Sequence, residues 1–397
     1  MGAALALWIR PGQVQAAVQN RIDAYSSRRM RTDWIETEPT ALDLPPIEVL
    51  TRLYLAAVRA LQSFRFSPDD VTQLRLALDG LSPRSADGLW RPSWNLPGES
   101  VPLRAWLSAN FPAVPAISTG IESTAVAWTA GLMGAGRLHD LRERLLVHVN
   151  DVVAGCLLHE TCQGTDSAAA PQITPLDLGT LTPGLLPWQY DLGERSLDAM
   201  AGGLGIAQRA RRIWMRRAEL SSFVAHRMLE LQPEDLPPQE PRLIGPTEDA
   251  VVSAGLNVSA APVVSDAEDE FDTGLDRAIR HSALWKLAGG QMSQIRGETV
   301  VAAAAQGDRL ACQLRSDASR SLSWGLEQTA RLLRVEQITI GGPLSGWLFD
   351  DLRDQLSQRT GSDEGRPPLK VDHAGELTDE LIWRGLFRPV AEFDVTK

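Results

Sequence analysis

The sequence is poor in cysteine and has no long apolar run. Its three cysteines, Cys156, Cys162 and Cys312, are too few for a disulfide framework, and none belongs to a CxxC pair. We therefore expect a cytoplasmic protein without structural zinc. The apolar stretch Ala3–Ile9 ends at Arg10 and is far shorter than the roughly 20 residues of a membrane helix. It has no basic segment before it, so it predicts a buried strand and neither a signal peptide nor a membrane anchor.

The sequence also has fewer positively charged residues than negatively charged ones. Lys and Arg number 39 against 50 Asp and Glu, which gives a formal net charge of −11. Such a balance disfavours nonspecific binding to DNA or to an anionic membrane. What the sequence does have is 397 residues, of which 44% are hydrophobic. This length and composition predict a large core divided over two or three domains.

The first half alternates between strand and helix patterns. Short apolar runs bounded by turn residues predict strands, and Pro46 opens a segment with helical spacing. The alanine-rich segment Glu122–Met133 also predicts a helix. The expected strands are Ala3–Ile9, Val14–Val18, Leu74–Leu78 and Leu145–Val149. Alternation of this kind is typical of α/β proteins.

The second half is mostly helical. Leu197–Leu231 has helical character, whereas Pro233–Asp272 is rich in proline and acidic residues and predicts a loop or partly disordered insertion. Helices resume near Leu275. A strand at Gln337–Ile340 is then followed by the pair Gly341-Gly342.

Five segments occur in an order that resembles one known family. They are Asn95-Leu96-Pro97, the Glu122 helix with Gly134-Ala135-Gly136 at its end, Gly297–Ala311, Gly341-Gly342 and Leu377–Phe387. Together they resemble the sugar kinases of the ROK (repressor, ORF, kinase) family. The resemblance implies a two-lobed, actin-like (ribonuclease H-like) α/β fold with a mixed five-stranded sheet in each lobe.

The resemblance also implies a domain division. We expect an N-terminal lobe at 1–118, the first part of the C-terminal lobe at 119–207 and a helical and acidic insertion at 208–274. The rest of the C-terminal lobe follows at 275–397, and its closing helix returns towards the N-terminal lobe.

Both phosphate-binding turns of the family depart from its pattern here. In the first, Trp8 occupies the place of an aspartate, and Arg10 and Pro11 occupy those of glycines. Proline has no N–H to donate to a phosphate. The second turn corresponds to Asn150–Ala154, where valines replace glycines and Asp151 would repel a phosphate. ATP and magnesium are therefore expected only if the protein is a divergent kinase.

The resemblance assigns a few further site residues. Glu122 matches the catalytic base, although a glutamate at a helix start has its own electrostatic reason. Asn95, Asp177 and Asp198 match sugar-contacting positions. Gly341 and Gly342 match the adenosine side of the nucleotide site, or else serve only the strand-to-helix turn.

The zinc site of the family is missing its ligands. Thr180 occupies the place of the histidine and Ser196 that of the last cysteine, and no cysteine lies between Cys162 and Cys312. A closed zinc site needs four such ligands, so we expect no zinc.

Two functions remain open at this stage. The first is a non-catalytic ROK-fold protein, a pseudokinase that acts as a scaffold, a partner-binding subunit or a sugar sensor. The alternative is a divergent ATP-dependent sugar kinase with Glu122 as its base. A ROK repressor is disfavoured because the first strand begins at residue 3. We expect a homodimer with a protein partner that binds the 208–274 insertion. The arginine-rich stretch Arg209–Arg217 in this segment either contacts RNA or an acidic partner, or forms a solvated helix face.

Overall fold

The computed structural model describes most of the chain outside its loops. The described residues are 2–20, 35–41, 44–78, 89–90, 100–138, 143–159, 172–181, 196–230, 279–360, 369–375 and 379–388. Asn95 and the expected insertion segment Pro233–Asp272 lie outside them. None of the helices in these ranges combines the length and apolar character that a membrane span requires.

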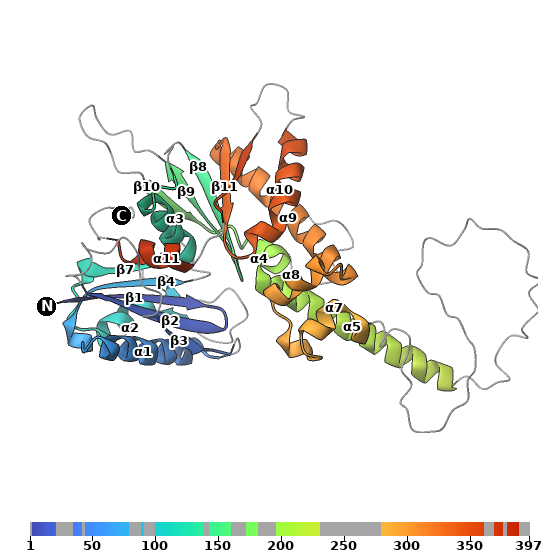
Figure 1. Ribbon diagram of the computed structural model, residues 1–397, viewed down its shortest axis with the longest axis horizontal. Helices are drawn as coiled ribbons and strands as arrows, with labels where there is room; N and C mark the ends of the chain where they lie inside the picture. Colours follow the sequence, from blue (N-terminus) through green and yellow to red (C-terminus); the bar gives the residue numbers. More distant parts are fainter. Residues whose placement is uncertain are drawn as a thin grey trace, which may run out of the picture.

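The first lobe is a five-stranded sheet with α1 and α2 on its outer face (Figure 1). Its strands are β1 (Ala3–Arg10), β2 (Gln13–Asn20), β3 (Ile35–Pro39), β4 (Val71–Leu78) and β7 (Thr119–Ser123), in the order β3-β2-β1-β4-β7. Helices α1 (Pro46–Ser63) and α2 (Leu103–Asn110) pack on it through leucines and Phe111. A two-stranded ribbon of β5 (Leu89–Trp90) and β6 (Val101–Pro102) lies beside α2.

The second lobe repeats this arrangement. Its strands are β8 (Arg144–Val149), β9 (Val153–His159), β10 (Gln172–Leu176), β11 (Gln337–Gly341) and β12 (Lys370–His373), in the order β10-β9-β8-β11-β12. Its helices are α4 (Leu197–Ala201), α5 (Gly203–Glu230), α7 (Ala283–Leu287), α8 (Gly297–Ala305), α9 (Arg309–Leu333) and α10 (Ser345–Thr360). They share one apolar core with β8 and β11.

The two sheets have the same internal plan. In each, the first strand pairs antiparallel with the second and parallel with the fourth, and the second pairs antiparallel with the third. The turn between β1 and β2 is thus equivalent to the turn between β8 and β9. This duplication, which no short repeat in the sequence indicates, confirms the expected actin-like fold with a mixed five-stranded sheet in each lobe.

Two helices lie between the sheets. Helix α3 (Thr124–Gly134) follows β7, and α11 (Asp379–Leu386) follows β12, and they pack against each other (Figure 1). Residues Thr124 to Leu132 of α3 are all buried, as expected of a helix that is apolar on every side. A single apolar cluster joins α3 and α11 to both sheets, from Trp8 of β1 to Leu146 of β8. The closing helix therefore does contact the first lobe.

The expected insertion boundary at residue 208 needs correction. Helix α5 runs without interruption through this position, and Ala210 and Trp214 are buried in the core of the second lobe. The edge of Trp214 contacts Trp285 of α7, with ring centroids 5.5 Å apart. The helix belongs to the lobe at least as far as Trp214, because removing it would expose this core.

Candidate functional site

A cleft of about 560 Å³ lies between the two lobes. The first lobe contributes the β1–β2 turn, from Arg10 to Gln13, together with Thr40 and Ala41. The second lobe contributes Asp151, one face of α5 and residues 293–298. The two equivalent sheet turns thus approach the same space, which is where the family resemblance locates the phosphates of ATP.

The first turn is occupied by its own side chains. Trp8 is 1% exposed, and its indole Nε1 donates a hydrogen bond to Oγ1 of Thr124 at 3.1 Å. Its ring meets that of Trp383 edge-on, with centroids 5.9 Å apart. The guanidinium of Arg10 stacks on Trp8 and lies 3.6 Å from the carboxylate of Asp379. The indole at the position that the resemblance assigns to an aspartate is therefore held by contacts with α3 and α11.

The second turn is closed by a carboxylate. The backbone N–H of Val153 donates to Oδ1 of Asp198 at 2.6 Å, and the N–H of Gly203 donates to the carbonyl of Asn150 at 2.8 Å. Asp198 thus braces this turn against α4. Because the carboxylate of Asp198 accepts the hydrogen bond from the N–H of Val153, that N–H is not available to a phosphate.

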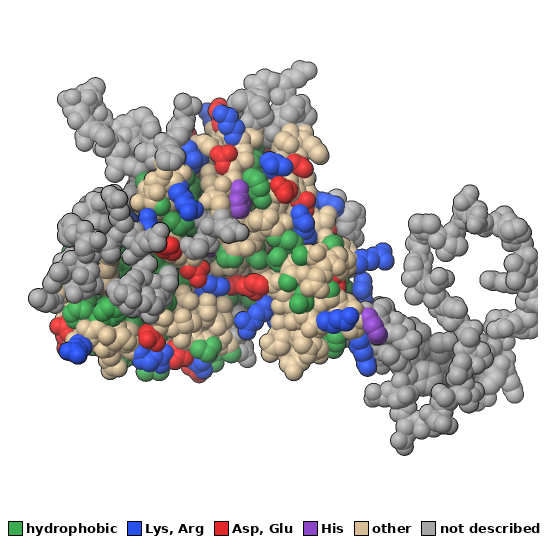
Figure 2. Space-filling view, in the orientation of Figure 1, with side chains coloured by type: hydrophobic (Ala, Val, Ile, Leu, Met, Phe, Trp, Pro, Cys, Tyr) green, Lys and Arg blue, Asp and Glu red, His purple; other side chains and the backbone are tan. Residues whose placement is uncertain are grey.

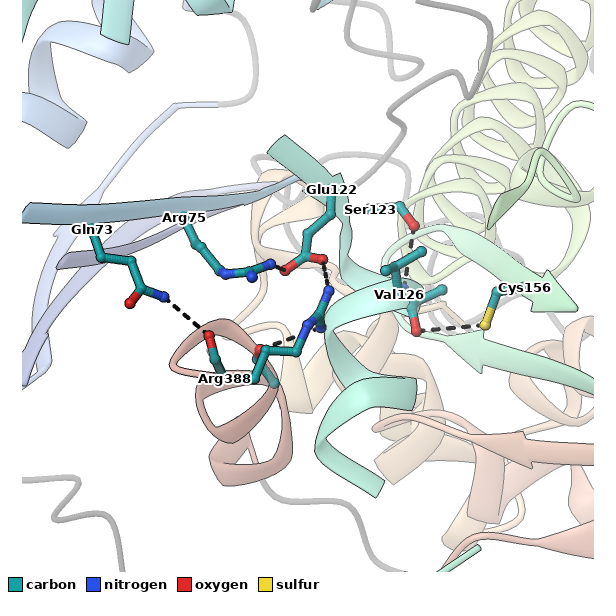
Figure 3. A network of polar contacts seen from close by, with 9 residues as sticks. Gln73, Arg75, Glu122, Ser123, Val126, Cys156 and Arg388 are labelled. Carbon is teal, nitrogen blue, oxygen red and sulfur yellow. Dashed lines mark hydrogen bonds and ion pairs between the residues drawn. The ribbon is translucent and has the colours of Figure 1, made fainter. Parts of the chain in front are cut away.

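Glu122 lies in a buried ion cluster (Figure 3). Its Oε2 accepts a hydrogen bond from Nη2 of Arg388 at 2.5 Å, and its Oε1 lies 3.8 Å from Nη1 of Arg75. Gln73 of β4 donates to the backbone carbonyl of Arg388 at 3.0 Å. Glu122 is only 6% exposed. This cluster of Arg75, Glu122 and Arg388, called the Glu122 cluster below, joins the end of α11 to the first sheet.

The expected helix beginning at Glu122 is wrong by two residues. Glu122 belongs to strand β7, where it pairs with Ala77. The residue that opens α3 is Ser123, whose Oγ accepts a hydrogen bond from the N–H of Val126 at 3.3 Å. Ser123, and not Glu122, therefore occupies the N-cap position of α3. A neutral hydroxyl that already caps a helix lacks the basicity of a carboxylate.

Other buried polar groups near the lobe junction are unreactive. Burial raises the pKa of the Cys156 thiol to about 12, although its hydrogen bond with Thr129 acts in the opposite direction. Burial, and to a smaller extent the charge of Arg10, lowers the pKa of His148 to about 3. At neutral pH the first group is a thiol and the second a neutral imidazole, so Cys156 is a poor nucleophile.

The pair Gly341-Gly342 has a structural role. Gly342 has φ of +101°, and a Cβ there would lie 2.4 Å from the carbonyl oxygen of Val149. Its own carbonyl accepts bonds from the N–H and the hydroxyl of Ser345 at the start of α10. The strand-to-helix turn is by itself sufficient reason for a glycine at this position, and a contact with the nucleotide stays a prediction.

The positions that the resemblance assigns to zinc do not fit a metal. Ser196 caps α4 by accepting from the N–H of Ala199, and the hydroxyl of Thr180 donates to the carbonyl of Asp177. Asp177 is exposed and Asp198 is engaged with Val153. Within the described ranges, no group of three or more His, Cys, Asp or Glu side chains is arranged to hold a metal ion.

Two arginines of the stretch Arg209–Arg217 in α5 make structural contacts. Arg209 is buried and pairs with Asp317 at 2.8 Å, and Nη2 of Arg211 donates to the carbonyls of Ser293 and Ile295. These bonds attach α5 to α9 and to the segment before α8. Figure 2 shows Lys and Arg side chains gathered at the end of the second lobe where α5 and α7 lie, and mixed with acidic groups elsewhere.

Comparison with known proteins identifies the fold. No family model and no curated protein sequence matches the chain. Solved structures do: a ROK family glucokinase from Streptomyces griseus, in complex with glucose and AMPPNP, is 16% identical with a TM-score of 0.58, over 97% of this chain and 98% of that one. Glucokinase from Balamuthia mandrillaris, in complex with glucose, is 9% identical with a TM-score of 0.53, over 98% and 93%. This chain has the two-lobed fold of the ROK sugar kinases.

Sequence reasoning missed the partners of Glu122. Arg75 interrupts the apolar pattern of β4, and a charged side chain in a buried strand indicates that a partner of opposite charge lies nearby. Nothing in the sequence indicated that Arg75 and Arg388, 313 positions apart, meet at the same carboxylate.

Proposed function

We propose that this protein is a ROK-fold pseudokinase that transfers no phosphate from ATP and functions by binding. The single observation that carries this proposal is the Glu122 cluster. A general base must bring an oxygen within about 3 Å of the hydroxyl that it deprotonates. The carboxylate of Glu122 is instead buried between the guanidinium groups of Arg75 and Arg388.

The phosphate-binding turns support the same conclusion. Phosphoryl transfer depends on positioning and on neutralising charge, and loss of one donor alone typically costs about 10²–10³ in rate. Here the first turn has a proline and a buried indole, and a donor of the second is bound to Asp198. Several such losses together reduce any residual transfer towards background.

A substrate screen tests the proposal. The protein is incubated with ATP, magnesium and a panel of hexoses and N-acetylated amino sugars, and ADP release is measured by a coupled assay. We expect no release above that of a sugar-free control. Turnover that disappears in Glu122→Gln while the variant remains folded would establish the divergent kinase instead.

The binding role leaves room for a sugar, for a second copy of the chain and for a protein partner. We propose a cytoplasmic homodimer with a partner site beyond Trp214, within the expected 208–274 segment. Trp214 is buried and Trp347 packs against the core, so neither of these large side chains offers an apolar surface for a dimer. Light scattering at micromolar concentration measures the mass directly, and a monomer would refute the dimer.

A further inference from the structure

Three arginines line the cleft between the lobes. The resemblance implies a glycine at the position of Arg10 and assigns no role to the positions of the other two. Arg10 comes from the β1–β2 turn, Arg211 from α5, and Arg296 from the residue before α8. We propose that these side chains form a metal-independent binding site for a small phosphorylated polar molecule, such as a sugar phosphate. The inference rests on the proposed binding role and specifies its ligand.

Two of the guanidinium groups are close enough to repel each other. The pKa of Arg211 is lowered first by burial and then by the charge of Arg296. Neither arginine forms an ion pair with a carboxylate among the described residues. Nη2 of Arg211 is bound to the carbonyls of Ser293 and Ile295, whereas its Nε is buried without a hydrogen-bond partner among the described residues. An anion between these two groups would relieve their repulsion and accept charge-assisted hydrogen bonds.

The start of α8 faces the same space. Gly297 and Glu298 line the cleft, and Arg296 at the N-cap position makes no side-chain cap. The first N–H groups of a helix have no intrahelical acceptor, and the helix dipole favours negative charge at this end. α8 has nine residues. Its N-terminus and the two arginines therefore define one anion position built from both side chains and backbone.

The rest of the lining fits a polar organic body. At about 560 Å³ the cleft is larger than a phosphate group alone and within the usual range for small-molecule sites. Gln13, Thr40, Gln208 and Ser293 offer amide and hydroxyl groups that match the hydroxyls of a sugar. Asp151 and Glu298 bring negative charge into the cleft and oppose a ligand with several phosphates.

This site differs from the nucleotide site of an active kinase in what holds the phosphate. An active kinase uses glycine backbone and a magnesium ion, whereas guanidinium groups would hold it here. Arg10 contributes less positive charge to the site than Arg211 and Arg296 do, because the carboxylate of Asp379 lies 3.6 Å away and offsets its charge.

Calorimetry tests the site with defined probes. Inorganic phosphate, glucose 6-phosphate and glucose are titrated without metal, and ATP is titrated with and without magnesium. We expect glucose 6-phosphate to bind more tightly than phosphate or glucose, with an affinity that falls as salt is raised. Binding of inorganic phosphate and glucose 6-phosphate with equal affinity would limit the site to a bare anion and overturn the ligand class. Tight binding of ATP only with magnesium would restore the family's nucleotide site and refute the proposal.

Three variants separate this site from general charge effects. Arg296→Gln, at an exposed position, should weaken glucose 6-phosphate binding by about tenfold. Glu298→Gln should strengthen it a few-fold because a repelling charge is removed. Arg104→Gln removes the same charge from exposed α2 in the first lobe and should leave the affinity unchanged. Equal effects of Arg296→Gln and Arg104→Gln, or no detectable binding to the wild type, would overturn the site. Neither result depends on turnover, so the pseudokinase proposal is judged separately.

Discussion

Gly131 of α3 and Gly385 of α11 bring the backbones of the two interlobe helices into contact. A Cβ at Gly131 would lie 1.8 Å from the carbonyl oxygen of Leu381, and a Cβ at Gly385 would lie 1.8 Å from that of Ala127. These neighbours are backbone atoms that cannot rotate away. The two glycines therefore fix how closely the helices that join the lobes can pack.

The first prediction follows from this contact. Gly131→Ala and Gly385→Ala should each lower the free energy of unfolding by about 1–3 kcal/mol or more, because the helices must separate. Chemical denaturation measures the change. The control is Gly346→Ala in α10, where a Cβ would meet nothing within 4 Å. This control should be neutral or stabilising by about 0.5–1 kcal/mol, since alanine favours a helix more than glycine does. Equal destabilisation at all three positions would contradict the close packing.

The second prediction concerns Trp8. Trp8→Phe keeps the ring contact with Trp383 but leaves Oγ1 of Thr124 without its indole donor, so we expect a loss of about 1–3 kcal/mol. Trp8→Asp, which introduces the residue that the resemblance implies here, places a carboxylate in an apolar cluster and should unfold the protein or nearly so. A stable Trp8→Asp protein with new ATP turnover would contradict this prediction, because it would show that Trp8 is not required to pack the turn.

The architecture could be predicted from the sequence more fully than the site. Apolar runs bounded by turn residues located β1, β4 and β8, because strand patterns depend on local alternation and burial. The start of α3 was placed two residues early, since a helical spacing of alanines does not reveal that Ser123 is the cap. The Glu122 cluster could not be predicted at all. It depends on the closing helix docking against β4 and on Arg388, just after that helix, reaching Glu122 of β7, contacts that only the complete fold creates.

The third prediction is a pH effect. His148 has a folded-state pKa near 3, well below its ordinary value of about 6.5, so the unfolded chain binds more protons in this window. The stability contributed by neutral His148 is complete above pH 6.5 and is lost as pH falls towards 3. The slope is about 1.4 kcal/mol per pH unit, or about 2 kcal/mol by pH 5.

Denaturation of matched variants at pH 7.5 and pH 5 isolates this effect from other titrating groups. His148→Phe should lose less stability between the two pH values than the wild type does, because no imidazole remains to be protonated. The exposed His281 provides the control, as His281→Gln should follow the wild type. If His148→Phe shows the same acid sensitivity as the wild type, burial of His148 is not its source.

The last prediction tests whether Glu122 holds the lobes together. Glu122→Gln removes the charge that offsets Arg75 and Arg388 and should cost about 3–5 kcal/mol, because two buried guanidinium groups lose their counterion. Removing both sides of the closer pair, in Glu122→Leu combined with Arg388→Met, should recover part of this loss, since only Arg75 then remains buried without a counterion. A double-mutant cycle on Glu122 and Arg388 should therefore give a coupling energy above about 1 kcal/mol. Additive effects would mean that the two residues act independently, and the carboxylate would again be available for another role.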